Sequence, residues 1–336
     1  MSKLLVTAVG PATSVQDGGR YGAQRYGLTP GGAMDRLALA VANCLVGNPL
    51  FAAVIEVGPL SAGFVAREGK VRVALSGAER HVEVAGHPLP FNQSCTLNDG
   101  DTLTLAAARG GTFSYLAIEG GVKGEPTFGS LAVNARAGLG SPFPRPLQVG
   151  DALDVDAAKP AAERRVQLPA LSGDPIRVVM GPQDNEFGEA KGLFLESEWK
   201  VSATSDRMGY RLEGPAITHL HGYNIVSDGT VNGSIQVPGN GQPIVLMPDR
   251  GTSGGYPKIA TVISADLGRF AQIPAGRNFR FRAVTVAEAQ AEARAMAELL
   301  RSLPDRVREV RDADMTDALQ NANIAGSAVN AFDSGT

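Results

Sequence analysis

Residues 233–263 read GSIQVPGNGQPIVLMPDRGTSGGYPKIATVI, and this stretch predicts the rim of a β-sheet. Two glycine-rich polar loops, at 238–241 and 248–257, separate three runs of β-type residues, at 235–237, 244–247 and 259–263. Polar loops between apolar strands are how a rigid sheet presents polar side chains at its edge. The alternative is an ordinary hairpin loop with a solvated tip.

Short β-type runs separated by turns continue on both sides of this stretch, and the chain holds 41 glycines and 21 prolines. This pattern of short β-type runs and turns predicts a mainly β protein built as a barrel or sandwich. A weak likeness between the turns at 97–103 and 147–153 favours two related halves. We therefore expect a first β-barrel-like half at 1–160 with one helix near 36–46, a second half at 174–284, a C-terminal helix at 285–303 that Pro304 ends, and a mobile polar tail at 304–336.

The 336 residues carry a formal net charge of −3 and contain no run of Lys or Arg. This composition argues against nucleic acid or an anionic membrane as a partner and favours a small molecule or a protein. No stretch reaches the roughly 18 apolar residues of a membrane span, and the N-terminus lacks the pattern of a secretion signal. We therefore expect a cytoplasmic protein with neither a nucleic-acid nor a membrane partner.

Eight segments, which occur in order over residues 10–280, carry a family resemblance. They read VQDGGRYG (15–22), PGGAMD (30–35), ANCLVGNP (42–49), YLAIEGGV (115–122), GPQDNEF (181–187), SDRMGYRLEG (205–214), IQVPGNGQPIVLMPDRGTSGGYPKIATVI (235–263) and AQIPAG (271–276). In these segments the chain resembles the C subunit of the prokaryotic ATP-dependent 5-oxoprolinases, a family that includes allophanate hydrolase subunit 2, KipA-like proteins and biotin-dependent carboxyltransferase domains. The resemblance implies a mainly β fold of two cyclophilin-like β-barrel domains, to which the residue pattern adds a few short helices and the C-terminal helix.

The resemblance implies one component of an ATP-dependent amidohydrolase, which opens the 5-oxoproline lactam to glutamate and is active only together with its A and KipI-like B subunits. It also implies ATP and Mg²⁺ as cofactors, bound by this chain or at the interface with a partner. Two alternatives stay open: the carboxyltransferase component of a urea carboxylase or allophanate-type system, and a KipI-partnered regulator of a histidine kinase. The sequence has no Ala/Val-Met-Lys-Met motif and no GxxxxGK[ST] loop, so we expect no covalent biotin and no nucleotide P-loop on this chain.

Three residues are predicted to be catalytic: Lys258, Asp249 and Arg207. Opening an amide needs donors for a phosphate or a developing oxyanion, and a carboxylate that acts as a base or Mg²⁺ ligand. We assign Asp249 to the carboxylate role, and the metal ligands are otherwise unassigned. Lys258 is alternatively a surface lysine, and Arg207 alternatively pairs with its neighbour Asp206 to shape a turn.

Further residues are predicted to bind substrate or nucleotide: Asp17, Arg20, Gly31, Gly32, Asp35, Asp206, Gln236, Thr252, Gly254, Gly255 and Tyr256. Asp35 either marks a helix N-terminus that receives an anion or simply caps that helix. Glu56 lies among apolar neighbours, where a buried hydrogen bond and a ligand contact are both open. Residues 129–133 read GSLAV where the family usually has Gly-Ser-Arg-Ser-Thr, so a guanidinium donor is missing from that segment.

Overall fold

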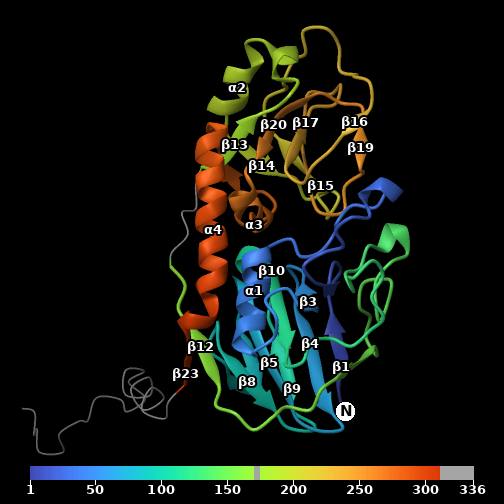
Figure 1. The fold of residues 1–336 in the computed structure, drawn as a ribbon, viewed down its shortest axis with the longest axis vertical. Coiled ribbons are helices and arrows are strands. Elements are labelled where there is room, and N and C mark those ends of the chain that lie inside the picture. The colour runs from blue at the N-terminus through green and yellow to red at the C-terminus, as the bar shows by residue number, and fades with distance from the viewer. Residues whose placement is uncertain (170–174, 311–336) are drawn as a thin grey trace, which may run out of the picture.

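The computed structural model describes residues 1–169 and 175–310, and the fold is mainly β, as the sequence predicts (Figure 1). The first half consists of two sheets that enclose one apolar core. The six-stranded sheet has the order β11 (Ala152–Val155), β1 (Ser2–Val9), β4 (Ala62–Arg67), β9 (Thr102–Leu105), β6 (Val82–Val84) and β7 (His87–Pro88). The five-stranded sheet has the order β2 (Ser14–Gln16), β3 (Val54–Val57), β10 (Arg109–Ile118), β5 (Val71–Glu79) and β8 (Ser94–Leu97).

The second half is a nearly closed barrel. Its eight-stranded sheet has the order β21 (Asn278–Phe279), β14 (Trp199–Val201), β15 (Gly209–Glu213), β18 (Ile244–Leu246), β17 (Ser234–Gln236), β20 (Lys258–Val262), β13 (Ile176–Met180) and β22 (Phe281–Ala283). The two end strands, β21 and β22, are separated in the chain by a single residue, which brings the two edges of the sheet together. β16 (Asp228–Gly229) and β19 (Ser253–Gly254) form a separate antiparallel pair. The stretch at 233–263 therefore supplies three barrel strands and β19.

Four α-helices and four short 3₁₀ turns complete the described part of the chain. The α-helices are α1 (Arg36–Leu45), α2 (Ala190–Glu196), α3 (Leu267–Ala271) and α4 (Val286–Arg306), and the 3₁₀ turns are η1 (Gln24–Tyr26), η2 (Ala135–Ala137), η3 (Asp184–Phe187) and η4 (Ser264–Asp266). Figure 1 shows α4 running beside both α1 and β13, so this helix spans the two halves.

The C-terminal helix starts where the sequence predicts and ends later. Thr285 and Glu288 form a capping box, in which the Thr285 hydroxyl accepts from the Glu288 N–H. Pro304 lies inside the last turn instead of ending the helix, and its neighbour Leu303 is fully buried. The chain then forms β23 (Val307–Glu309), which pairs with β12 (Arg164–Val166), so residues 304–309 are ordered secondary structure. The expected tail from 311 onward lies outside the described residues.

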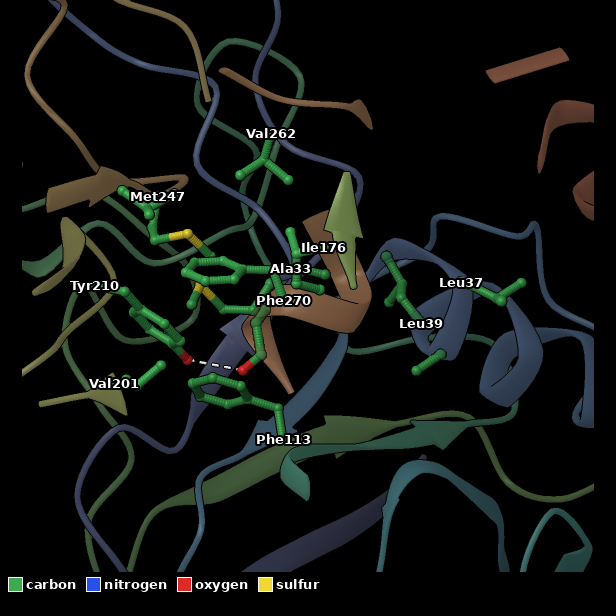
Figure 2. Packing of buried hydrophobic residues seen from close by; sticks show 14 of the residues in the cluster. Ala33, Leu37, Leu39, Phe113, Ile176, Val201, Tyr210, Met247, Val262 and Phe270 are labelled. Carbon is green, nitrogen blue, oxygen red and sulfur yellow. Dashed lines mark hydrogen bonds between the residues drawn. The ribbon is translucent and has the colours of Figure 1, made fainter. Parts of the chain in front are cut away.

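The two halves share a core. Residues of α1 and β10 in the first half pack into one cluster with the inside of the barrel. Figure 2 shows Phe113 of β10 beside Tyr210 and Phe270 of the second half, and the Tyr210 hydroxyl donates to the Ala271 carbonyl at 2.8 Å. Because this apolar contact joins the halves, polar loops of both meet at the edge of the same junction.

Candidate functional site

Arg207 lies at the junction and is held by groups from both halves. Its Nη1 donates to Glu56 Oε1 at 2.5 Å, and its Nε donates to Asp249 Oδ2 at 2.8 Å. Its Nη2 donates to the Gly32 carbonyl at 2.6 Å and to Gln16 Oε1 at 3.3 Å. The neighbouring aspartate, Asp206, is not its partner, because Asp206 Oδ1 accepts the N–H groups of the following turn. Arg207 is therefore a bridge between the two halves.

Glu56 is the central carboxylate of this cluster and is fully buried in β3. Its Oε2 accepts the Met34 N–H and the Tyr115 hydroxyl, both at 2.8 Å. Burial raises the pKa of Glu56, and Arg207 and these two hydrogen bonds oppose that rise. Burial also acts to lower the pKa of Arg207, but Asp249 and Glu56 outweigh it, so the pKa is raised and the guanidinium stays charged.

Of the two carboxylates that pair with Arg207, Asp249 is more accessible than Glu56. Its side chain is 12% exposed, whereas that of Glu56 is 0% exposed. Asp249 Oδ1 lies 3.3 Å from the position that a Cβ of Gly31 would occupy, and Arg20 Nη1 lies 3.2 Å from the same point. A side chain at residue 31 would therefore crowd both the carboxylate and the guanidinium. A base must reach its substrate, so Asp249 suits that role better than Glu56.

Arg20 and Asp17 lie against the segment that departs from the family pattern. Asp17 accepts the Ser130 hydroxyl and the Leu131 N–H, each at 2.7 Å, and Arg20 Nη2 donates to the Ala132 carbonyl. Arg20 is 1% exposed, and its Nε and Nη1 have no hydrogen-bond partner in the described part of the chain. Burial lowers the pKa of Arg20, against the attraction of Asp17 and Asp249. Residues 129–133 therefore bear directly on the predicted binding residues.

Asp35 caps α1, which was one of the two interpretations open from the sequence. Its Oδ1 accepts the N–H groups of Leu37 and Ala38, both at 3.1 Å. Its Oδ2 accepts from Gln272 Nε2 at 3.0 Å, so the second half also holds this carboxylate. Burial raises the pKa of Asp35, against these hydrogen bonds. The cap occupies the helix N-terminus where an anion would otherwise bind.

Position 32 accommodates only glycine, because its backbone conformation and its close neighbours leave no room for a side chain. Its φ is +81°, and a Cβ there would lie 2.8 Å from the Asp17 carbonyl and from Gly19 Cα. These neighbours are backbone atoms and cannot turn away as a side chain would. The backbone therefore approaches closely enough for the Gly32 carbonyl to reach Arg207.

Lys258 forms a second cluster at the barrel rim. The side chain is 4% exposed, and Nζ donates to Asp228 Oδ2 at 2.8 Å. The Lys258 N–H donates to Gln183 Oε1 at 3.2 Å. Lys258 is therefore a buried, paired lysine and not a surface one. Asp249, which the sequence places in the adjoining loop, bonds to Arg207 in the other cluster.

The remaining predicted binding residues lie around the Lys258 cluster. Gln236 pairs with Lys258 across β17 and β20, and its buried Nε2 has no hydrogen-bond partner within the described ranges. Gly254 packs on the Gln236 amide, and the Gly255 carbonyl accepts the Ile225 N–H at 2.8 Å. The Thr252 carbonyl accepts the Thr230 N–H, and Tyr256 is 37% exposed at the outer face. The predicted site residues thus divide between the junction and the barrel rim.

The sequence analysis left the role of Glu56 open between a buried hydrogen bond and a ligand contact, and it did not name Gln16 or Asp228. A usable signal existed for Glu56, because a glutamate in the run Val-Ile-Glu-Val needs a buried partner. The partner itself lies 151 positions along the chain. No local pattern marks Gln16 or Asp228, which take part only through contacts formed on folding.

The described residues form neither a cluster of metal-ligating side chains nor a helix that could span a membrane. Over residues 1–169 and 175–310, no group of three or more His, Cys, Asp or Glu side chains is placed to hold a metal ion. The described helices include none with the length and apolar character that crossing a bilayer requires. Within these ranges the chain therefore forms no cage of three or more such ligands, and we derive no step through Mg²⁺, which usually takes only one or two carboxylates and completes its shell with phosphate and water.

Comparison with known proteins identifies relatives along most of the chain. The family model for the carboxyltransferase domain, subdomain A and B, matches residues 26–283. The 5-oxoprolinase C subunit of Escherichia coli (strain K12) is 38% identical over 290 residues, which are 85% of this chain and 93% of that protein. A putative urea carboxylase of Emericella nidulans is 29% identical over 300 residues, which are 84% of this chain but 24% of that protein.

Solved structures also match this chain. The Kluyveromyces lactis urea carboxylase matches with a TM-score of 0.82 and 26% identity over 93% of this chain and 30% of that one. The protein TTHA0988 matches with a TM-score of 0.76 and 32% identity over 84% of this chain and 55% of that one. This chain therefore spans about half or less of these two solved chains. The match of the family model to most of the sequence, together with a relative 38% identical along nearly its whole length, shows that the chain belongs to the carboxyltransferase domain, subdomain A and B, family.

Proposed function

We propose that this protein is the C-type component of an ATP-dependent 5-oxoprolinase, which opens the lactam to glutamate together with partner subunits. The observation that carries the proposal is the 38% identity to a 5-oxoprolinase C subunit over 93% of that relative. A second relative of the same name, from Haemophilus influenzae, is 34% identical over 89% of its length. Matches to nearly complete subunits favour this function over that of multidomain proteins of which the chain covers a small part.

The junction cluster is the proposed site of the reaction on this chain. Lactam opening adds water across the ring C–N bond, so the oxygen of water bonds to the carbonyl carbon and the ring nitrogen leaves as an amine. Asp249, partly accessible and oriented by Arg207, positions that water and takes its proton. Arg20 is buried, and its Nε and Nη1 have no partner among the described residues, so it adds positive charge beside Asp249 and does not contact the substrate. Arg207 has its donors engaged and acts as a positioning residue.

ATP, Mg²⁺ and the partner subunits belong to the proposal as well. When bound, ATP would supply its γ-phosphoryl group to the amide oxygen, and that group would leave as inorganic phosphate when water opens the ring, with ADP as the other product. Lys258, buried beside Asp228 and Gln236, is the proposed contact of this chain with the nucleotide or with the partner that carries it. The A and KipI-like B subunits supply the rest of the assembly, and the proposed location is the cytoplasm.

A second candidate is the transfer of a carboxyl group to urea or a similar small amide. The observation that favours it is the TM-score of 0.82 to the Kluyveromyces lactis urea carboxylase over 93% of this chain. Both reactions act on a planar amide, so the same junction could serve either one. In that case biotin arrives on another chain.

Reconstitution separates the candidates. The purified chain is mixed with the A and B subunits from the same organism, and glutamate formed from 5-oxoproline and ATP is measured. We expect glutamate only from the complete mixture. Carboxyl transfer from carboxybiotin to urea without any glutamate would replace the first candidate by the second. Neither reaction, with tight binding of the KipI-like partner, would point to a regulator.

Matched variants test the assigned residues in the same assay. We expect Asp249→Asn and Lys258→Ala to lower glutamate formation at least about 100-fold and 10-fold, since general base catalysis and charged hydrogen bonds contribute on this scale. The control is Lys200→Ala, which removes an exposed lysine of β14. Urea unfolding of each variant shows whether the fold is kept. Full activity in a folded Asp249→Asn protein would remove Asp249 from the site.

A further inference from the structure

A cavity of about 730 Å³ lies where the two halves meet. Its wall includes the start of α1, the turn that follows α3, and one face of α4, and Figure 1 shows these three helices close together. Most of the wall is apolar, with Leu37, Met296 and Leu300 among its residues. Ligand sites are typically of this kind, with a concave apolar wall, a few polar groups and a place between domains.

Arg250 is a buried cation in this wall with almost no partner. It is 6% exposed, and within the described residues its guanidinium makes one hydrogen bond, from Nη2 to the Thr230 carbonyl at 3.4 Å. Its Nε is buried and has no acceptor, and no carboxylate of the described chain pairs with it. Burial lowers the pKa of Arg250, and no nearby charge offsets this effect. Such a group is costly unless a ligand completes it.

Arg80 shows what a structural buried arginine looks like in the same protein. It is 4% exposed and also has no carboxylate partner, and burial lowers its pKa to about 10. Its Nε donates to the Ser114 hydroxyl at 2.8 Å, and its Nη1 and Nη2 donate to three backbone carbonyls at 2.7 to 3.0 Å. The fold therefore satisfies Arg80 without a ligand. Arg250 lacks this set of acceptors, although it is buried to a similar degree.

A second unpartnered atom lies in the same wall. Asn232 Oδ1 is buried and has no hydrogen-bond partner among the residues that the structure describes. The segments that carry Asn232 and Arg250 run side by side, because the Gly233 N–H donates to the Leu246 carbonyl and the Thr230 N–H donates to the Thr252 carbonyl. The wall thus presents an unused cationic donor and an unused acceptor from adjacent segments.

We propose that Arg250 and Asn232 form a subsite for a small amide that carries a carboxylate, with Arg250 on the carboxylate and Asn232 on the amide N–H. This assignment rests on the proposed function, because 5-oxoproline has its carboxylate on the ring carbon next to its N–H. Urea has N–H groups but no carboxylate. Arg250 would therefore be the residue that selects 5-oxoproline over urea.

The proposed base, Asp249, is flanked by residues of the cavity wall but does not itself line the cavity. Asp249 lies between Pro248 and Arg250, which both line the cavity, and Asp249 Oδ1 faces Gly31 of the same wall. A ligand held by Arg250 through its carboxylate would keep its lactam within the cavity, on the part of the wall that holds Gly31 and Pro248. Arg250 would act in binding and Asp249 in the reaction.

The experiment compares two ligands that differ only in the carboxylate. Binding of 5-oxoproline and of 2-pyrrolidinone is measured by calorimetry on the full chain and on its complex with the A and B subunits. For the wild type we expect 5-oxoproline to bind at least about 10-fold more tightly, as charged hydrogen bonds contribute on this scale. Arg250→Met should abolish this difference, and Arg250→Lys should keep part of it. Asn232→Leu should weaken both ligands, and the control Arg67→Met, an exposed arginine of β4, should change neither.

The outcomes separate this inference from the proposed function. Equal affinity of the wild-type protein for the two ligands overturns the subsite. This outcome is measured without any variant, so the inference can be tested even if the Arg250→Met protein folds poorly. Glutamate production with an unchanged KM for 5-oxoproline in Arg250→Met also overturns it, while the proposed function stands. A complex that makes no glutamate but binds 5-oxoproline in an Arg250-dependent way supports the subsite and removes the proposed reaction.

Discussion

Replacing Arg207 by methionine should destabilise the protein strongly, because it removes the cation from a buried cluster. Glu56 is fully buried and would keep only two neutral donors, Met34 N–H and the Tyr115 hydroxyl. Removing one partner of a buried ion pair costs about 3–5 kcal/mol of unfolding free energy. Asp249 contributes less to this loss, since its side chain is 12% exposed and water reaches it.

The pH dependence gives the sharper form of this prediction. Burial already raises the pKa of Glu56 in the folded protein, so the folded state binds its proton more tightly than the unfolded chain does. The stability that this proton supplies is present below the unfolded pKa and is lost as the pH rises through the folded pKa. Without Arg207 the folded pKa rises further. The deficit of Arg207→Met should therefore be small near pH 4 and grow toward pH 7.

Urea unfolding of the full chain at pH 4, 5.5 and 7 measures this deficit. The double variant Arg207→Met with Glu56→Gln should recover much of the stability at pH 7, because no charge is then left buried. Such neighbouring pairs show coupling energies of about 0.5–3 kcal/mol. A deficit below about 1 kcal/mol at pH 7, or one that does not change with pH, would refute the picture of a charged bridge between the halves.

Three further outcomes follow from the structure. Asp249→Asn should lower glutamate formation in the complete complex while shifting the urea midpoint less than Arg207→Met does, and the opposite ranking in unfolding would make Asp249 a structural residue. Asp266→Asn should destabilise by about 3 kcal/mol at pH 7, since this buried carboxylate bonds to Arg177 and Arg269. Those bonds outweigh burial and lower the pKa of Asp266, so this stability is present above its unfolded pKa and is lost as the pH falls through the folded one; a deficit unchanged at pH 2 would contradict it. Gly32→Ala should cost at least about 2 kcal/mol by thermal unfolding, because the new methyl meets backbone at 2.8 Å, and a wild-type Tm would show that the loop shifts freely.

The mainly β class, helix α1 and the capped start of α4 all follow from local sequence. Two N-cap residues can be recognised locally: Asp35 precedes an apolar-periodic run, and Thr285 lies three positions before Glu288. Each caps its helix through hydrogen bonds within the first turn. Strand β13 has an equally local origin, since it is a β-branched run that can be recognised without knowing its neighbours. Strand β7, two exposed residues, offers no such run.

The sequence also named the loops that carry the candidate site, but the tertiary structure decided how they group. Asp249 and Lys258, the first residue of β20, are only nine positions apart, yet Asp249 bonds to Arg207 and Lys258 to Asp228. Which partner a side chain meets depends on contacts 30 to 151 positions away, and no local period encodes such distances. The stretch at 233–263 determined by itself that polar loops would top a sheet. The packing of the two halves around one apolar core determined which polar side chains of that stretch kept an unused hydrogen-bonding group at the cavity wall, as Arg250 does.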